Sequence, residues 1–199
     1  MHQVRTARID DAATVGAVLA DGFHDDPVLS WVFQGADDVR AAKLNALFGF
    51  LAPEVDVPLG ATFVTDGGCA CWTPTPGTDE WPEERSARFD DVLRRACDDA
   101  DMARLGLLSS TMAEHHPPAP HWYLGTIAVI RSSQGTGVGT ALLRHSLAIV
   151  DGAGAPAYLE STNVRNVPLY ERHGFRATGR IVVPGGPPLT PMWREPAGP

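Results

Sequence analysis

Residues 122–150 read WYLGTIAVIRSSQGTGVGTALLRHSLAIV, and the character of the sequence changes twice within this segment. Residues 122–130 are mostly aromatic, β-branched or otherwise apolar, which is typical of a strand. After a glycine-rich turn, Val138, Leu142 and Ile149 recur at helical spacing, and neighbouring leucines widen this apolar stripe. The segment therefore predicts a strand, a tight glycine-rich loop and a helix.

The glycine-rich turn has the chemistry of a phosphate site. The first turn of a helix presents unpaired N–H groups and the positive end of the helix dipole, and glycines let the backbone approach an anion closely. A Walker loop is excluded because no lysine follows the glycines. The dinucleotide fingerprint fails as well, because Thr140 stands where its last glycine should be. The turn therefore predicts a phosphate or pyrophosphate ligand of another kind.

A second informative segment, residues 159–175, reads LESTNVRNVPLYERHGF. Asn166 is a suitable N-cap for a short helix that has Pro168 in its first turn. Gly174 is expected to end that helix in the left-handed conformation. The segment therefore predicts a strand, a short helix that presents Tyr170, and a following strand.

The rest of the chain supplies helices first and strands later. Asp10 or Asp11 is the expected N-cap of the first helix, and the turn of the hairpin is Asp66-Gly67-Gly68. Expected helices cover residues 12–23, 39–51, 83–100 and 102–113, expected strands cover 62–65, 69–72, 157–161 and 175–183, and 184–191 is an expected loop. This order predicts an α/β chain with a mixed sheet.

Composition narrows the class of protein. The net charge of −8 argues against nucleic acid as a partner and is compatible with a cationic amine substrate. No run of about 18 apolar residues occurs, so no membrane span is expected, and the polar N-terminus does not resemble a signal peptide. Cys69 and Cys71 lie in an apolar alternating segment and lack the spacing of a zinc site, so no metal and a reduced, cytoplasmic setting are expected.

Taken together, the two motifs resemble those of the GNAT family of N-acetyltransferases. The first is Gln134-x-x-Gly137-x-Gly139, and the second is an asparagine followed by Leu-Tyr-x-x-x-Gly-Phe. One departure is Arg131, which stands where the family commonly has proline. The resemblance implies one domain over residues 1–199, with its acetyl-CoA-binding core at about residues 121–183. It also implies a mixed, mostly antiparallel sheet flanked by helices, with acetyl-CoA in a cleft between the central strands.

The resemblance also implies roles for individual residues. Asn163 matches the usual spacing for a pantetheine contact better than Asn166, Tyr170 would lie near the CoA sulfur, and Glu160 is the first candidate for the general base. The alternative for Glu160 is a structural carboxylate paired with an arginine, and His115 is the second candidate base. The residues implied in acetyl-CoA binding are Ile127, Ala128, Val129, Gln134, Gly135, Thr136, Gly137, Val138, Gly139, Thr140, Asn163 and Asn166.

The reaction implied by the resemblance is direct acetyl transfer from acetyl-CoA to a small-molecule amine in a ternary complex. The acceptor would lie near residues 23–33, and the protein would be a monomer or a homodimer. Two alternatives stay open, an acetyltransferase that modifies proteins or peptides and a non-catalytic acyl-CoA sensor.

Overall fold

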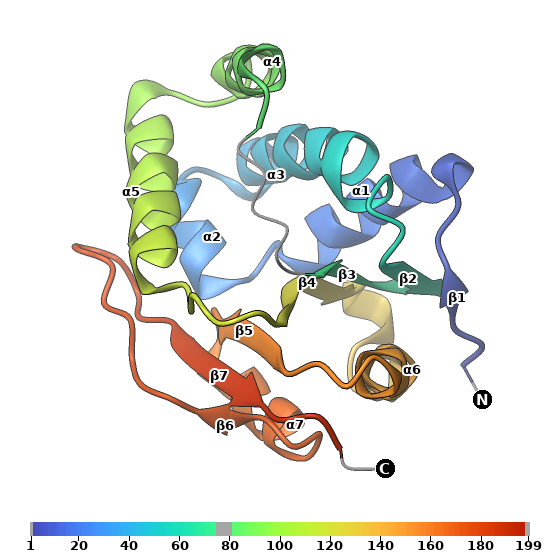
Figure 1. Ribbon diagram of the computed structural model, residues 1–199. Coiled ribbons are helices and arrows are strands. Elements are labelled where there is room, and N and C mark those ends of the chain that lie inside the picture. The colour runs from blue at the N-terminus through green and yellow to red at the C-terminus, as the bar shows by residue number, and fades with distance from the viewer. Residues whose placement is uncertain (1, 75–80, 198–199) are drawn as a thin grey trace.

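The computed structural model describes residues 2–74 and 81–197 (Figure 1). In chain order the elements are β1 (Arg5–Thr6), η1 (Ile9–Asp11), α1 (Ala12–Gly22), α2 (Pro27–Val32), α3 (Asp37–Leu51), the π-helical η2 (Ala52–Asp56), β2 (Thr62–Thr65), β3 (Gly68–Pro74), α4 (Glu83–Arg94), α5 (Asp99–His115), β4 (Trp122–Val129), η3 (Arg131–Ser133), α6 (Val138–Gly152), β5 (Ala157–Ser161), η4 (Val164–Asn166), α7 (Val167–Glu171), β6 (Arg176–Ala177) and β7 (Thr190–Arg194).

The strands form one seven-stranded mixed sheet in the order β1-β2-β3-β4-β5-β7-β6. Among the described pairs, β4 and β5 run parallel, and the neighbouring strands elsewhere in the sheet are antiparallel. This agrees with the α/β class and the mostly antiparallel sheet expected from the sequence.

The parallel pairing between β4 and β5 is short, and the two strands then separate. Trp122 pairs with Ala157 and Tyr123 with Tyr158, and β4 then continues to Val129 paired with β3 alone. The register with β3 also shifts here: Cys71 pairs with Thr126 but Trp72 with Leu124, so the residue between them, Gly125, is an extra residue of β4. Such bulges bend a strand and increase its twist. The edge of β4 that faces β5 therefore has main-chain groups without a sheet partner.

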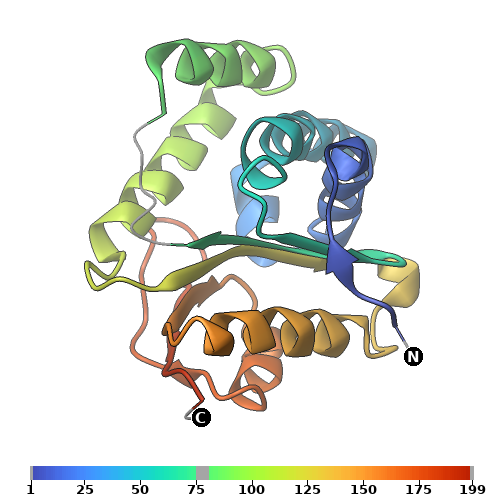
Figure 2. The ribbon, with the colours of Figure 1, turned by 45° about the vertical axis from the view of Figure 1, so that its right-hand side comes forward.

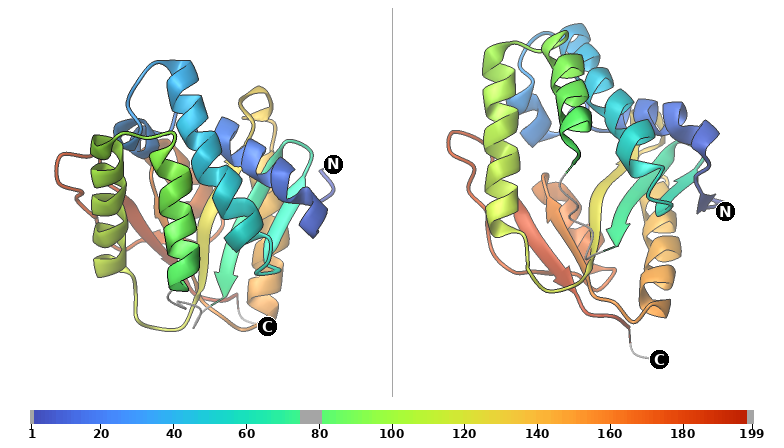
Figure 3. Two further views of the ribbon diagram at one scale, coloured as in Figure 1. Left: turned by 90° about the horizontal axis from the view of Figure 1, so that it is seen from above. Right: turned by 45° about the horizontal axis from the view of Figure 1, so that its top comes forward.

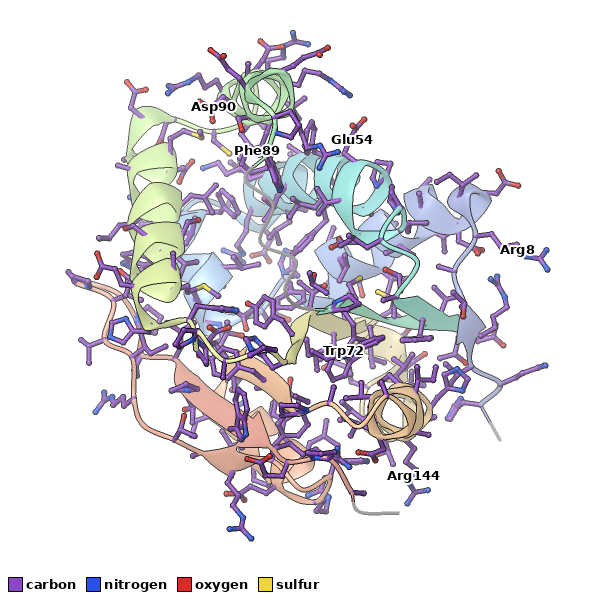
Figure 4. The ribbon with its side chains drawn as sticks, in the orientation of Figure 1. Arg8, Glu54, Trp72, Phe89, Asp90 and Arg144 are labelled. Atoms are coloured by element: carbon purple, nitrogen blue, oxygen red, sulfur yellow. The ribbon has the colours of Figure 1, made fainter. Side chains whose placement is uncertain are left out.

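Helices cover both faces of the sheet. Figure 2 shows the sheet nearly edge-on, with α1, α3, α4 and α5 on one side and α6 and α7 on the other. Seen from above, α3, α4 and α5 lie over one face (Figure 3). Successive side chains of β3 point to opposite faces of the sheet, because side chains alternate along a strand. Cys69 and Cys71 join the core under α1 and α3, and Ala70 and Trp72 join the core against α6. Trp72 is labelled in Figure 4.

A buried ion network ties α5 to α3. Asp101 is fully buried, and its carboxylate binds Lys43 of α3 at 2.5 Å and Arg104 of its own helix at 2.6 Å. Arg104 also donates to the carbonyl of Val32 at 2.9 Å, and Lys43 donates to the carbonyl of Gln34 at 2.7 Å. These contacts fix the short α2 segment, which follows the loop at the mouth of the cleft described below.

The expected helices do not include α2, because a residue before proline avoids the helical region, and Asp26-Pro27 therefore indicates a break after the first helix. The break is also a helix start: the Asp26 carboxylate accepts the N–H groups of Val28 and Leu29 at 3.0 Å each, and Pro27 occupies the first helical position. At the C-terminal end of α1, by contrast, the expected boundary is correct to within one residue.

The C-terminal strands also differ from expectation. In the segment expected as a strand over residues 175–183, only Arg176–Ala177 forms a strand, and Ile181 makes an isolated bridge with Leu189. The expected loop at 184–191 instead turns the chain back at Gly185, which has a φ of 73°, and leads into β7. β7 lies between β5 and β6. The turn residues were recognised, but the strand they introduce was not.

Asp56, at the end of η2, is expected to make stability depend on pH. Burial raises the pKa of its carboxyl group to about 7, and its Oδ2 has no hydrogen-bond partner among the described residues. An unfolded aspartate titrates near pH ~4, so the folded state holds a proton that the unfolded state releases between about pH 4 and about pH 7. The free energy of unfolding therefore falls as the pH rises through this window.

We expect Asp56→Asn to raise the free energy of unfolding by about 2–4 kcal/mol at about pH 8 and to change it little at about pH 4. Urea denaturation across this range measures the effect. The exposed Asp90, labelled at the surface in Figure 4, provides a control, and Asp90→Asn should leave the pH profile of stability unchanged. An equal shift for Asp56→Asn at both ends of the range would contradict the prediction.

Candidate active site

A cleft of about 690 Å³ lies where β4 and β5 part. Its walls come from the loop after α1, the free edge of β4, the loop that opens α6, and the segment from β5 through α7. Of the residues predicted to bind the acyl donor, those that line the cleft are Ile127, Ala128, Val129, Gln134, Gly135, Gly137, Gly139, Thr140, Asn163 and Asn166. Both candidate catalytic residues, Tyr170 and Glu160, line it too.

The glycine-rich loop has the geometry of an anion site. Gly135 and Gly137 have φ values of 77° and 93°, a region that L side chains rarely adopt, and no atom lies within 4 Å of where a Cβ would stand. Gly137 is the N-cap of α6, and no side chain caps the helix, so its first N–H groups are available to a ligand. The Gln134 side chain closes the loop by donating from Nε2 to the Val129 carbonyl at 3.2 Å.

Two residues of the predicted loop site, Thr136 and Val138, do not line the cleft. The Thr136 hydroxyl donates to the carbonyl of Ser133 at 2.6 Å, which holds the turn together. Val138 is 2% exposed and packs in the core beside Gly68, where an added Cβ would come within 2.5 Å of it. Their side chains therefore shape the loop from within.

Arg131, the departure from the family pattern, anchors the loop to α1. Its main-chain N–H donates to Asp21 Oδ2 at 2.7 Å, and its guanidinium lies 3.1 Å from Asp21 Oδ1. A proline at this position would lack that N–H. The arginine therefore fixes the strand-to-loop junction through a contact that a proline could not make.

The second motif supplies the wall opposite the loop. Asn163, rather than Asn166, makes the capping contact here: its side chain accepts the N–H of Arg165 at 3.1 Å and starts η4. Asn166 makes no side-chain cap bond and is exposed along the cleft. Gly174 ends the segment with a φ of 88°, as expected.

Tyr170 is buried at 6% exposure, and its ring packs edge-on against Phe175 at 6.1 Å between centroids. Burial, and to a smaller degree the nearby charge of Asp26, raises the pKa of its hydroxyl well above the ordinary value. The hydroxyl therefore stays protonated across the neutral range. A protonated phenol that lines the cleft can donate a hydrogen bond or a proton.

Glu160 has no arginine partner among the described residues, so the structural alternative considered for it finds no support. Its side chain is fully shielded from solvent, and neither carboxylate oxygen has a hydrogen-bond partner within the described chain. The Nδ1 of His116 lies 3.8 Å from Oε1. Burial, the charge of Glu160 and a hydrogen-bonding interaction with its carboxylate raise the pKa of the Tyr123 and Tyr158 hydroxyls, although these contacts fall outside strict hydrogen-bond geometry. A buried carboxylate that has no arginine partner and lies in a cleft wall is available to accept a proton.

His115, the second candidate base, does not line the cleft. It is exposed near the end of α5, and its Nδ1 donates to the carbonyl of Thr111 at 2.8 Å.

A link between the first and last parts of the cleft is not visible in the sequence. The Thr162 hydroxyl, just after β5, donates to Asp26 Oδ2, while Asp26 Oδ1 caps α2. Burial raises the pKa of Asp26. The Asp-Pro pair was a visible signal of a helix start, but nothing local to either segment indicates that Asp26 and Thr162 meet.

Two arginines of the cleft, Arg165 and Arg172, were likewise not assigned a role. Both line the cleft, and neither forms an ion pair with another described residue. The available signal in the sequence was that these two basic residues stand close together in a chain with a net charge of −8. Guanidinium groups that share a cleft with a helix N-terminus suit a ligand that carries several phosphates.

The described residues contain no group of three or more His, Cys, Asp or Glu side chains placed to hold a metal ion. Nor is any described helix long and apolar enough to cross a bilayer.

Comparisons with known proteins agree with this geometry. A model of the acetyltransferase (GNAT) family matches residues 69–175. An uncharacterized N-acetyltransferase of Schizosaccharomyces pombe is 28% identical over 176 residues, which covers 83% of this chain and 70% of the yeast protein. A Corynebacterium glutamicum structure, described as histone acetyltransferase HPA2 and related acetyltransferase, is 30% identical with a TM-score of 0.72, over 100% of this chain and 98% of that one. Arylalkylamine N-acetyltransferase 2 of Aedes aegypti shares the fold at 14% identity and a TM-score of 0.60, over 98% and 99% of the two chains.

Proposed function

The chain belongs to the acetyltransferase (GNAT) family, whose model matches more than half of it, and we propose that it transfers the acetyl group of acetyl-CoA to a primary amine of a small molecule. Family membership makes it an acyl-CoA-dependent acetyltransferase. The observation that carries the finer proposal is the meeting of three features in one cleft: the glycine-opened N-terminus of α6, the free edge of β4, and the pair Tyr170 and Glu160.

In this proposal the pyrophosphate of acetyl-CoA binds the N–H groups of the loop from Gln134 to Thr140. Arg165 and Arg172 add positive charge. The pantetheine arm lies along Ile127, Ala128 and Val129, where the edge of β4 offers main-chain hydrogen-bonding groups in place of a neighbouring strand. Asn163 and Asn166 contact the arm from the other wall. The fit rests on open space at the glycines and on unpaired main-chain groups.

The reaction is direct transfer in a ternary complex. The amine nitrogen attacks the thioester carbonyl, so a carbon–nitrogen bond forms and the carbon–sulfur bond breaks. The proton lost by the amine passes to Glu160, directly or through a water molecule, and the departing thiolate takes a proton from the Tyr170 hydroxyl. The raised pKa keeps the hydroxyl protonated before the transfer, CoA leaves as the thiol, and the Tyr170 phenolate regains a proton from water before the next turnover.

A small, cationic amine suits the acceptor end of the cleft. Asp25, Asp26 and Glu160 all line it, and acidic clefts attract cations. From the segments at residues 21–26, 65–74, 114–129 and 159–199 we infer a resemblance to puromycin N-acetyltransferase, which implies a small-molecule amine as the acceptor. We propose a single domain that acts in the cytoplasm as a monomer or a homodimer.

The test is thiol release from acetyl-CoA in the presence of one amine at a time. The panel contains puromycin, aminoglycosides, polyamines, arylamines, amino acids and N-terminal peptides, with a control that lacks amine. Release above the control with a small amine, and little with peptides, is the expected result. Binding of acetyl-CoA without release for any amine would contradict the proposal and favour the acyl-CoA sensor.

One observation favours a second candidate function. The Corynebacterium glutamicum structure, at 30% identity, is described as a histone acetyltransferase. If this chain acts on proteins, the peptides of the panel should be better acceptors than the small amines. The panel therefore separates the two candidates directly.

A further inference from the structure

A chain of side chains leads from Glu160 out of the cleft wall toward the end of α5. The aromatic ring of His116 packs edge-on against Tyr123 at 4.9 Å and Tyr158 at 5.3 Å, and lies tilted 4.9 Å from the ring of His121. These three residues, together with Glu160, are the titratable groups that meet at His116, and they come from β4, β5 and the connector between α5 and β4. His116 differs from Glu160 in access: its side chain is 23% exposed, while that of Glu160 is fully shielded.

Hydrogen bonds fix which ring nitrogens carry protons. His121 Nδ1 lies 2.7 Å from the carbonyl of Ala119, and because a carbonyl only accepts, Nδ1 must carry the hydrogen. Burial lowers the pKa of His121, so its ring is neutral near neutral pH and its Nε2 is an acceptor. His116 Nε2 lies 3.1 Å from that atom and must therefore be the donor. In neutral His116 the remaining nitrogen, Nδ1, has a free lone pair, and it is the atom that faces Glu160.

From this arrangement we propose that His116 is a positioning residue and proton relay for Glu160, held by His121 in the tautomer that accepts a proton from the carboxyl group. The proposal rests on the proposed function, because it concerns the proton that the acceptor amine gives up. Glu160 takes that proton and becomes a neutral carboxylic acid. Its O–H bond then breaks as an N–H bond forms at His116 Nδ1. The same Nδ1–H bond then breaks as the proton passes to water, which restores the neutral Nε2–H form and keeps the hydrogen bond to His121.

Because Glu160 is buried, it needs a route by which to lose its proton before the next turnover. None of its described neighbours other than His116 combines contact with Glu160, an imidazole ring and partial exposure. The separation of 3.8 Å exceeds a hydrogen bond, so the transfer requires an approach of about 1 Å or one bridging water. Catalytic contacts are often longer without ligands than in the reacting complex.

The first test does not depend on turnover. In protein labelled with ¹⁵N-histidine, two-bond ¹⁵N–¹H correlations at neutral pH identify the tautomer of each ring. We expect the Nε2–H form for His116 and the Nδ1–H form for His121. The opposite tautomer at His116 overturns the relay, and this result holds whether or not the proposed acceptor chemistry is correct.

The second test is kinetic and uses the best amine of the panel. His116→Ala is expected to lower kcat/KM for the amine about tenfold or more near neutral pH, with unchanged acetyl-CoA affinity. The defect should shrink at high pH, where hydroxide can take the proton from Glu160 in place of the imidazole, and added imidazole should restore part of the rate. His115→Ala, at the exposed neighbour, should behave like the wild type. A defect of equal size at every pH with no imidazole rescue, or no defect at all, overturns the proposal.

Discussion

Replacing Gly137 by aspartate is expected to weaken acetyl-CoA binding by about 100-fold or more, the largest single effect expected on the binding step. Gly137 has a φ of 93° and precedes the first N–H groups of α6. A side chain there strains the backbone, and a carboxylate competes with the phosphates for the N–H groups and repels them. Losing two or three charge-assisted hydrogen bonds accounts for an effect of about 3 kcal/mol, or roughly 100-fold.

A matched control lies at the other end of the same helix. Gly154 follows α6, has a φ of 64° and has open space around its Cβ position, but it does not line the cleft. Gly154→Asp therefore introduces similar strain and the same charge without touching the loop. Titration calorimetry with acetyl-CoA should show a loss for Gly137→Asp and near wild-type affinity for Gly154→Asp. Equal affinity for the two variants would contradict the assignment of the loop.

The strand and helix that bind the donor could be predicted because each carries its own signals. β4 and α6 are long, regularly patterned segments, and the glycines between them have the positive φ that the turn requires. The short α2 and β7 have weaker patterns. Six residues give α2 less than two turns, and β7 exists only because it pairs with β5 and β6. Partners distant in sequence decide such elements.

The residues of the candidate site divide in the same way, into those that the local sequence predicts and those whose surroundings depend on distant segments. The residues of the loop lie next to one another in the chain, so their spacing alone predicts a common ligand. The environment of Glu160 is different, because its neighbours His116, Tyr123 and Tyr158 come from separate segments. A carboxylate at a strand end gives no sign of whether an arginine or an aromatic shell will surround it. The Asp26–Thr162 contact is hidden for the same reason.

Replacing Tyr170 by phenylalanine is expected to lower kcat by about 10- to 100-fold while leaving acetyl-CoA affinity within about twofold of the wild type. The ring and its contact with Phe175 remain, so the core keeps its packing and only the hydroxyl is lost. Without a proton donor the thiolate must leave as an anion in a partly desolvated cleft. Because the raised pKa keeps Tyr170 protonated across the neutral range, the size of the defect should not vary with pH there.

Single-turnover rates with bound acetyl-CoA separate this chemical step from product release, and the choice of donor tests the role of the hydroxyl. An acetyl thioester of a more acidic arylthiol needs less protonation of its leaving group, so the deficit of Tyr170→Phe should narrow with such a donor. A deficit that is the same for both donors would assign Tyr170 to packing or to alignment of the thioester. Wild-type turnover with acetyl-CoA would remove its hydroxyl from the mechanism altogether. The donor comparison therefore distinguishes a group that gives up a proton from one that only fills space beside the sulfur.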